Sequence, residues 1–231
     1  MAVRLIENCA RVSQILFEIG AVHCDLDRPF VFTSGWASPV YVNCRKLLST
    51  TWQRREIIQL AAEEIERDIG REGFDVVAGG ETAGIPFAAW IAEYFYRPMI
   101  YVRKARKQHG LQQEIEGSLE PGQRTILVED LTTDGSSKIY FCDVLRRLGA
   151  TVDHAISVFY YGVYPDTERK FEDANLCLHA LTDWRTTLEV GAARGHFDSR
   201  QAAAVKAFLD DPAAWSAAHG GAGAASSGAA G

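Results

Sequence analysis

The chain lacks the residue patterns that mark a disulfide-bonded or zinc-stabilised domain. Its five cysteines are odd in number, and no two of them have the spacing of a CxxC motif. Its six histidines form no HExxH or HxxxH pattern. Because disulfide frameworks and structural zinc sites are built from such pairs, we expect reduced thiols and no structural metal.

The chain also lacks a long apolar run and an excess of positive charge. Arg4, Glu7 and Arg11 interrupt the N-terminal apolar residues, which excludes the continuous apolar region of a secretory signal peptide. The best apolar stretch, residues 85–92, is too short to span a membrane. The formal charge of −6 is unlike that of nucleic-acid and membrane-surface binders, which are normally basic. We expect a cytoplasmic protein that binds neither nucleic acid nor a membrane.

Short apolar strands alternate with helical segments from residue 74 onwards. The five strands read FDVVAGG, PMIYVRK, RTILVED, HAISVFYYG and NLCLHALT, with helices at 85–96 and 137–148. This alternation predicts an α/β fold with a doubly wound, mainly parallel, five-stranded sheet. Upstream, apolar periodicity predicts helices over 3–19 and 51–69, the second capped by Thr50 or Thr51, and the segment 29–43 is typical of a hairpin that turns at Ser34-Gly35.

Residues 127–138, LVEDLTTDGSSK, place two acids at the end of a predicted strand and hydroxyls and glycine before a helix. The free backbone N–H groups and the dipole of a helix start favour an anion, and a phosphate monoester fits there. The acids Glu129 and Asp130 would repel that phosphate, but they suit the two vicinal hydroxyls of a ribose. The segment therefore predicts a ribose 5-phosphate site, and the alternative is a capped helix after a polar turn.

Two other loops follow neighbouring predicted strands, and ligands of such sheets bind beyond the carboxyl ends of the strands. RKARKQHG (103–110) contains five basic side chains, and a bound anion would reduce the repulsion between them. The alternative is a solvated run of charges. The polar stretch from this loop to Gly117 has the character of a mobile lid over a pyrophosphate. GGETAG (79–84) supplies small residues for close backbone approach or for a tight turn. Together the loops fit phosphoribosyl pyrophosphate (PRPP), which would bring Mg²⁺ with no direct protein ligand.

These motifs carry a resemblance to a known family. LVEDLTTDGSS resembles the PRPP-binding motif of the type I phosphoribosyltransferases, and YVRKARKQHG resembles the mobile loop of its orotate phosphoribosyltransferase branch. SGWASPVYVNCRKL and GGETAGIPFAA are similar to that branch too, and the similarity extends over roughly residues 5–215 in order along the chain. The resemblance implies the type I fold, with an N-terminal helix and hood over 1–50, a core over 51–215 and a disordered Gly/Ala-rich tail over 216–231.

The resemblance also implies an activity and a set of site residues. The activity is transfer of ribose 5-phosphate from PRPP to orotate, which gives orotidine 5′-monophosphate and pyrophosphate in UMP biosynthesis, in a homodimer whose subunits share the mobile loop. Arg103, Lys107 and His109 would be catalytic. The implied PRPP ligands are Arg103, Lys104, Lys107, His109, Glu129, Asp130, Leu131, Thr132, Thr133, Asp134, Gly135, Ser136 and Ser137. We expect orotate contacts from Thr133, Tyr41, Arg45 and Tyr161.

Several positions depart from the family pattern, mostly around the base. Thr33 and Ala83 stand where lysines are common, Tyr41-Val42 replaces paired aromatics, and an aromatic of the run 159–161 replaces an arginine. Asp134 adds an acid beside the phosphate loop, and we expect its side chain to point outward. Two alternatives follow: a phosphoribosyltransferase for another nucleobase, and a non-catalytic PRPP-sensing regulator. The N-terminal segment disfavours the first, and the acidic charge with Lys107 and His109 retained disfavours the second.

Overall fold

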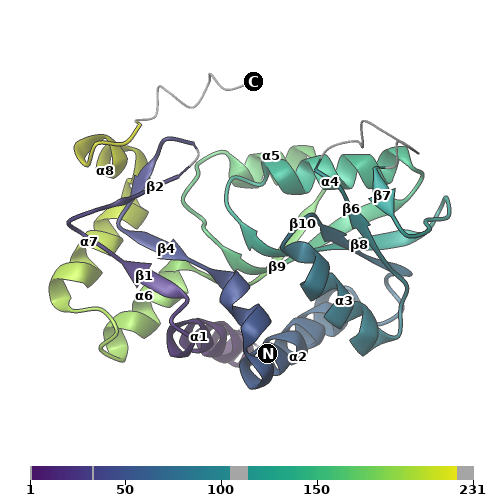
Figure 1. The fold of residues 1–231 in the computed structure, drawn as a ribbon, viewed down its shortest axis with the longest axis horizontal. Helices are drawn as coiled ribbons and strands as arrows, with labels where there is room; N and C mark the ends of the chain where they lie inside the picture. Colours follow the sequence, from purple (N-terminus) through teal and green to yellow (C-terminus); the bar gives the residue numbers. More distant parts are fainter. Residues whose placement is uncertain (1, 33, 105–113, 223–231) are drawn as a thin grey trace. The chain divides into compact units, whose positions relative to one another are not determined.

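The computed structural model describes residues 2–32, 34–104 and 114–222, which belong to two compact units (Figure 1). The first unit draws on residues up to Lys46 and from Thr182 onwards, and the second comprises Leu47–Leu181. No helix in these ranges is long and apolar enough to cross a membrane. The predicted hood over 1–50 and tail over 216–231 remain predictions.

A six-stranded sheet forms the centre of the second unit, in the order β10-β9-β8-β5-β6-β7 (Figure 1). The strands are β5 (Val76–Gly80), β6 (Met99–Val102), β7 (Ile115–Glu116), β8 (Arg124–Thr132), β9 (Thr151–Tyr160) and β10 (Cys177–Asp183). β5 pairs in parallel with β6 and β8, and β8 pairs in parallel with β9. The predicted mainly parallel sheet is confirmed, but five strands was one too few. The missed strand, β7, is two residues long and pairs antiparallel with Tyr101 and Val102.

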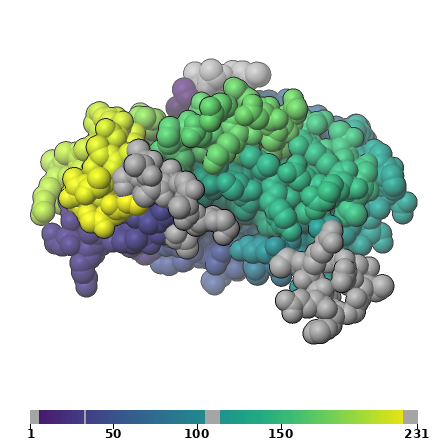
Figure 2. All heavy atoms as spheres, turned by 90° about the horizontal axis from the view of Figure 1, so that it is seen from above, coloured from purple at the N-terminus to yellow at the C-terminus, as the bar shows by residue number. Residues whose placement is uncertain are grey.

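Helices cover both faces of this sheet. α2 (Thr51–Asp68) and α3 (Gly84–Phe95) lie on one face, and α4 (Ser136–Arg147) and α5 (Thr167–Asp173) lie on the other (Figure 1). The space-filling view shows green α5 beside teal α4 (Figure 2). Phe141 and Leu145 of α4 and Phe171 of α5 bury their side chains in one core with the strands. The helices predicted at 51–69, 85–96 and 137–148 are confirmed within one residue at each end.

The strand order places a topological switch point beside β5. The chain leaves β5 for β6 on one side and later enters β8 on the other side. The loop after β5 leads into α3 and the loop after β8 leads into α4, on opposite faces of the sheet. A crevice at the carboxyl ends of two such strands is where doubly wound folds bind ligands. The fold therefore brings the 79–84 and 131–136 segments to one edge.

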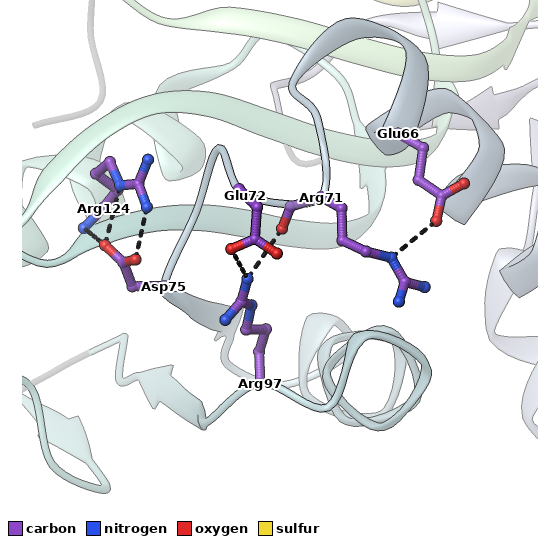
Figure 3. A network of polar contacts seen from close by, with 6 residues as sticks. All are labelled: Glu66, Arg71, Glu72, Asp75, Arg97 and Arg124. Carbon is purple, nitrogen blue, oxygen red and sulfur yellow. Dashed lines mark hydrogen bonds and ion pairs between the residues drawn. The ribbon is translucent and has the colours of Figure 1, made fainter.

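An ion-pair network lies at the opposite, amino-terminal end of the same strands (Figure 3). Arg124, the first residue of β8, donates to the Asp75 carboxylate at 2.7 and 3.0 Å, and its backbone N–H donates at 2.9 Å. Arg97, after α3, donates to Glu72 at 2.9 Å. These contacts tie the starts of β5 and β8 together and lie away from the carboxyl edge.

The first unit is mainly helical. It contains α1 (Ala2–Glu18), α6 (Trp184–Ala193), α7 (Ser199–Asp210) and α8 (Pro212–Ala218), with β1 (Val22–Cys24), β2 (Phe30–Val31), β3 (Ala37–Ser38) and β4 (Val40–Val42); the 3₁₀ helix η1 (Cys44–Ser49) leads into the second unit. The predicted hairpin is confirmed, because β2 pairs antiparallel with β3 and Gly35 turns with φ 83°. Buried Ser13 of α1 shares hydrogen bonds with Thr182 and Thr187, at 2.7 and 2.9 Å, which ties α1 to α6.

Candidate active site

The two acids of the ribose 5-phosphate motif lie inside β8, not beyond its end. β8 continues for two residues past Asp130, because these residues pair with Phe159 and Tyr160 of β9. Glu129 and Asp130 are each only 7% exposed. The strand therefore fixes the backbone of both acids, and burial strengthens the electrostatic effect of each carboxylate.

Glu129 forms a buried ion pair with Lys138 in the first turns of α4. Lys138 Nζ lies 3.2 Å from Glu129 Oε2, and both side chains are less than 10% exposed. Burial raises the pKa of Glu129 to about 7; the charge of Lys138 opposes that shift, and the charge of Asp130 adds to it. Glu129 is therefore a carboxyl group that gains or loses its proton near neutral pH.

Sequence reasoning missed Lys138, although a signal for it was present. Lys138 precedes Phe141, Cys142 and Leu145 by three, four and seven positions, and these three residues are buried. That spacing puts Lys138 on the apolar face of the helix. A lysine on such a face needs an anionic partner, and Glu129 is the acid that the sequence places at the adjoining strand end.

The glycines of the 79–84 loop make room for the Glu129 side chain. A Cβ added at Gly80 would lie 1.7 Å from Glu129 Oε1 and 2.4 Å from Phe141. A Cβ added at Gly84 would lie 2.5 Å from the carbonyl oxygen of Val128. Within residues 2–32, 34–104 and 114–222, no group donates a hydrogen bond to Glu129 Oε1. This oxygen is sealed from solvent against the glycine backbone, so a ligand hydroxyl can reach it only if the 79–84 loop moves.

The predicted phosphate loop leads into α4, and the Asp134 side chain contacts the first turn of this helix. Gly135 holds the N-cap position with φ 80°, and a Cβ there would lie 2.7 Å from Phe171. Asp134 accepts hydrogen bonds from Ser136, at 2.5 Å from Oγ and 3.4 Å from the backbone N–H, and lies 3.6 Å from Lys170 Nζ. Burial raises the pKa of Asp134, but the bonds from Ser136 and the charge of Lys170 outweigh it and lower the pKa below its ordinary value.

The expectation that the Asp134 side chain points outward stays a prediction. Its side chain is partly exposed but is held against the first turn of the helix. The other members of the predicted phosphate loop differ in exposure. Thr132 is fully buried in β8, Leu131 and Thr133 are half-buried, and Ser136 and Ser137 are exposed. Thr132 can reach a ligand only if the end of β8 rearranges, and its role stays a prediction.

The structure brings the start of the basic loop to the same edge. The backbone N–H of Lys104 donates to Glu81 Oε2 of the 79–84 loop at 2.8 Å. The charge of Lys104 also makes a small contribution that lowers the pKa of Glu129. Arg103 pairs with Glu116 of β7 at 3.1 Å. The predicted residues Lys107 and His109 lie outside the described residues.

The residues predicted to contact orotate belong to both units. In the first unit, Tyr41 of β4 is 37% exposed with its ring near those of His23 and Phe30, and Arg45 is exposed on η1. In the second unit, Thr133 follows β8, and Tyr161 is buried with its ring edge-on to a neighbouring phenylalanine. Their roles stay predictions.

The chain is similar in sequence and in structure to known phosphoribosyltransferases. The profile of the phosphoribosyl transferase domain family matches residues 50–177. An orotate phosphoribosyltransferase of Rhizobium rhizogenes is 48% identical over 210 residues, which cover 91% of this chain and 90% of the relative. The crystal structure of the Aeropyrum pernix orotate phosphoribosyltransferase has a TM-score of 0.69 and 30% identity, covering 81% of this chain and 99% of its own.

A structure of Leishmania donovani UMP synthase has a TM-score of 0.73 at 23% identity, which shows the shared fold alone. The match covers 87% of this chain but 42% of that longer protein. By contrast, the bacterial relative matches almost end to end, through both compact units. The switch-point edge, the buried acid pair and this identity together place the chain in the orotate phosphoribosyltransferase family of phosphoribosyl transferases.

Proposed function

We propose that this protein transfers the ribose 5-phosphate group of PRPP to N1 of orotate, a step of pyrimidine (UMP) biosynthesis. The observation that carries the proposal is the 48% identity to an orotate phosphoribosyltransferase over 91% of the chain. In the reaction the bond from C1 of the ribose to the pyrophosphate oxygen breaks, N1 of orotate loses its proton, and the C1–N1 bond forms. The products are orotidine 5′-monophosphate and pyrophosphate.

Glu129 and Asp130 are the groups we assign to the ribose. Both are buried on β8, where the strand fixes their backbone beside the start of α4. Ionised carboxylates in a low-dielectric site also favour the positive charge that develops on the ribose ring as pyrophosphate departs. The pKa of Glu129, about 7, makes this assistance depend on pH.

The first turn of α4 is the group of donors we assign to the 5′-phosphate. Thr133, Gly135, Ser136 and Ser137 contribute backbone N–H groups and hydroxyls at a helix start, where an anion is stabilised. Asp134 accepts hydrogen bonds from the Ser136 donors. Phosphate binding then requires that this carboxylate move away, and Lys170 gives it an alternative partner.

The basic loop is assigned to the pyrophosphate. Arg103, Lys104, Lys107 and His109 supply positive charge that stabilises the leaving group most strongly when its charge is greatest, in the transition state. Closure of such a loop also excludes water from the reacting ribose. We further propose a homodimer in which this loop serves the neighbouring subunit, and a cytoplasmic location.

Mg²⁺ fits this site as a partner of the substrate. Within the described residues, each group of three donors close enough for one ion includes His179, which lies away from the Glu129 edge. We therefore assign an ion at the active site to pyrophosphate oxygens and water, with no direct protein ligand. When bound, Mg²⁺ neutralises pyrophosphate charge.

The test is loss of orotate absorbance in a mixture of the purified protein, PRPP, Mg²⁺ and orotate. We expect consumption that needs both PRPP and Mg²⁺, and a rate about 100-fold or more lower in Lys107→Ala. The matched control is Lys206→Ala, which removes an exposed lysine that pairs with Asp210 on α7 and should not alter the rate. Binding of PRPP with orotate left intact would refute the choice of base.

A further inference from the structure

A second cluster of reactive side chains lies on the sheet away from the candidate active site. His154 of β9 and Cys177 and His179 of β10 bring two imidazole nitrogens and a thiol sulfur within 4.8 Å of one another. His154 pairs with Ile126, three residues before Glu129 on β8, which is about 10 Å along the strand. Side chains three positions apart on a strand point to opposite faces, so the cluster does not share the Glu129 face.

The two histidines already have a geometry close to that of paired metal ligands. His154 Nδ1 and His179 Nε2 are 3.0 Å apart and share a hydrogen bond, which an ion bound to both nitrogens would replace. Two nitrogens bound to one tetrahedral Zn²⁺ at about 2.0–2.1 Å would lie about 3.3 Å apart, so a shift of a few tenths of an ångström suffices. Cys177 is exposed on the edge strand, and rotation of its side chain can bring Sγ to the ion.

Asp68 of α2 sets the orientation of His179. Its Oδ2 lies 3.3 Å from His179 Nδ1, which leaves Nε2 facing His154. Arg67 holds the Asp68 carboxylate with two hydrogen bonds of 2.8 Å. A carboxylate that accepts the second N–H of a histidine is the usual outer partner of a metal-binding imidazole.

A competing donor set shares His179 but is less suited to an ion. Glu64, Asp68 and His179 also lie within 4.8 Å of one another. Arg67, however, contacts Glu64 at 2.9 Å and Asp68 at 2.8 Å, so a cation already pairs with both carboxylates. The nitrogen and sulfur donors of the other set have no such cation bound to them in the described chain.

We propose that His154, Cys177 and His179 bind one divalent transition-metal ion of the Zn²⁺ class, with Asp68 as a positioning residue. Two imidazoles and a thiolate give a borderline-soft set, and solvent completes the tetrahedron. On binding, the thiol proton of Cys177 is released to solvent and His154 carries its proton on Nε2. The ion would tie edge strand β10 to β9. This site is independent of the proposed transferase reaction.

The test is titration of the untagged, metal-free full-length protein with Co²⁺ in the absence of PRPP. A thiolate ligand in a tetrahedral site gives a sulfur-to-cobalt charge-transfer band together with intense visible d–d bands. We expect both bands to saturate at one ion per chain, and addition of Zn²⁺ to abolish them. Cys177→Ser should remove the charge-transfer band, while Cys24→Ser, in the first unit, should retain it.

Two further variants test the histidine geometry. His154→Gln should abolish the tetrahedral spectrum, and Asp68→Asn should weaken Zn²⁺ binding about 10–100-fold. The matched control for Asp68 is Glu66→Gln on the same helix, which should leave the affinity unchanged. Circular dichroism of each metal-free variant verifies its fold. A wild-type protein without the charge-transfer band, or a band that persists in Cys177→Ser, overturns the site, and unchanged affinity in Asp68→Asn overturns the role of Asp68.

Discussion

Replacement of Lys138 by methionine isolates the buried ion pair of the candidate active site. Methionine keeps the length of the apolar stem but leaves Glu129 without its cation. The carboxyl group can respond by remaining protonated, because burial already raises its pKa to about 7. The cost of losing Lys138 therefore depends on pH.

The magnitude follows from proton linkage. Near pH 6 Glu129 is largely protonated in both proteins, so the variant should unfold with nearly the wild-type free energy. Above the pKa of about 7, wild-type Glu129 ionises beside Lys138, whereas the variant must keep its proton. Each pH unit above 7 then costs the variant about 1.4 kcal/mol, or about 3 kcal/mol at pH 9, within the roughly 3–5 kcal/mol range for broken buried pairs.

The assay is urea unfolding at pH 6, 7, 8 and 9 for the wild type, Lys138→Met and Lys138→Met/Glu129→Gln. We expect the difference between the single variant and the wild type to grow with pH, and the double variant to lack this dependence. Lys206→Met, which breaks an exposed pair with Asp210, serves as the control and should show little change. An equal loss of stability at pH 6 and pH 9 would refute the reasoning.

Three further predictions concern single positions. Asp134→Ala frees the Ser136 donors and removes a negative charge from a helix start, so the KM for PRPP should fall roughly two- to fivefold, whereas an unchanged or higher KM would contradict the competition. Gly80→Ala places a Cβ 1.7 Å from Glu129 Oε1, so PRPP affinity measured by calorimetry should fall at least about tenfold. Unaltered affinity would argue that the space left by Gly80 does not position Glu129. The arginine partner of Asp75 lowers the pKa of that carboxyl to about 2. The contribution of the pair to stability is therefore present above pH 3.8 and is lost as the pH falls toward 2. Asp75→Asn should flatten the decline of the urea midpoint between about pH 4 and pH 2, and a slope equal to that of the wild type would count against the pair.

The elements that the sequence predicts are those with a long apolar period. The four predicted helices and five predicted strands are confirmed because each buries a repeating face or a continuous run of side chains. Strand β7 was missed because two residues are too few to show an alternation of apolar and polar side chains, and only the pairing with β6 defines the strand. Thr50 shows the limit of local rules: it holds the N-cap position of α2, but its hydroxyl donates to the carbonyl oxygen of Leu47 at 3.2 Å and caps nothing.

The helices after residue 183 had signals that could have been used. Asp183, Asp198 and Asp211 each accept a hydrogen bond from the backbone N–H three residues later, at 2.8, 2.7 and 3.0 Å. Asp198 with Gln201 forms a capping box, which is readable from sequence. These three aspartates mark the starts of α6, α7 and α8.

The candidate site also contains some features that local sequence predicts and others that depend on the fold. The acid pair and the helix start are contiguous in the chain, so strand and helix signals place them together. The ion pair of Glu129 with Lys138, and the meeting of His154 with Cys177 and His179, depend on which strands and faces adjoin. Because no short sequence spacing encodes those contacts, the histidines and the cysteine form no metal-binding motif that can be recognised in the sequence.

Gly80 and Gly84, which pack against the Glu129 side chain, restrict how this sequence can change over time. A glutamate at 129 fills the volume that any side chain at 80 would need, and crowds position 84 as well. A shorter aspartate at 129 would withdraw its carboxylate by about one methylene, but a Cβ at 80 would still lie 2.4 Å from Phe141. A side chain at 80 should therefore be tolerated only after both the acid at 129 and the ring at 141 have become smaller, so positions 80, 129 and 141 should change together among descendants.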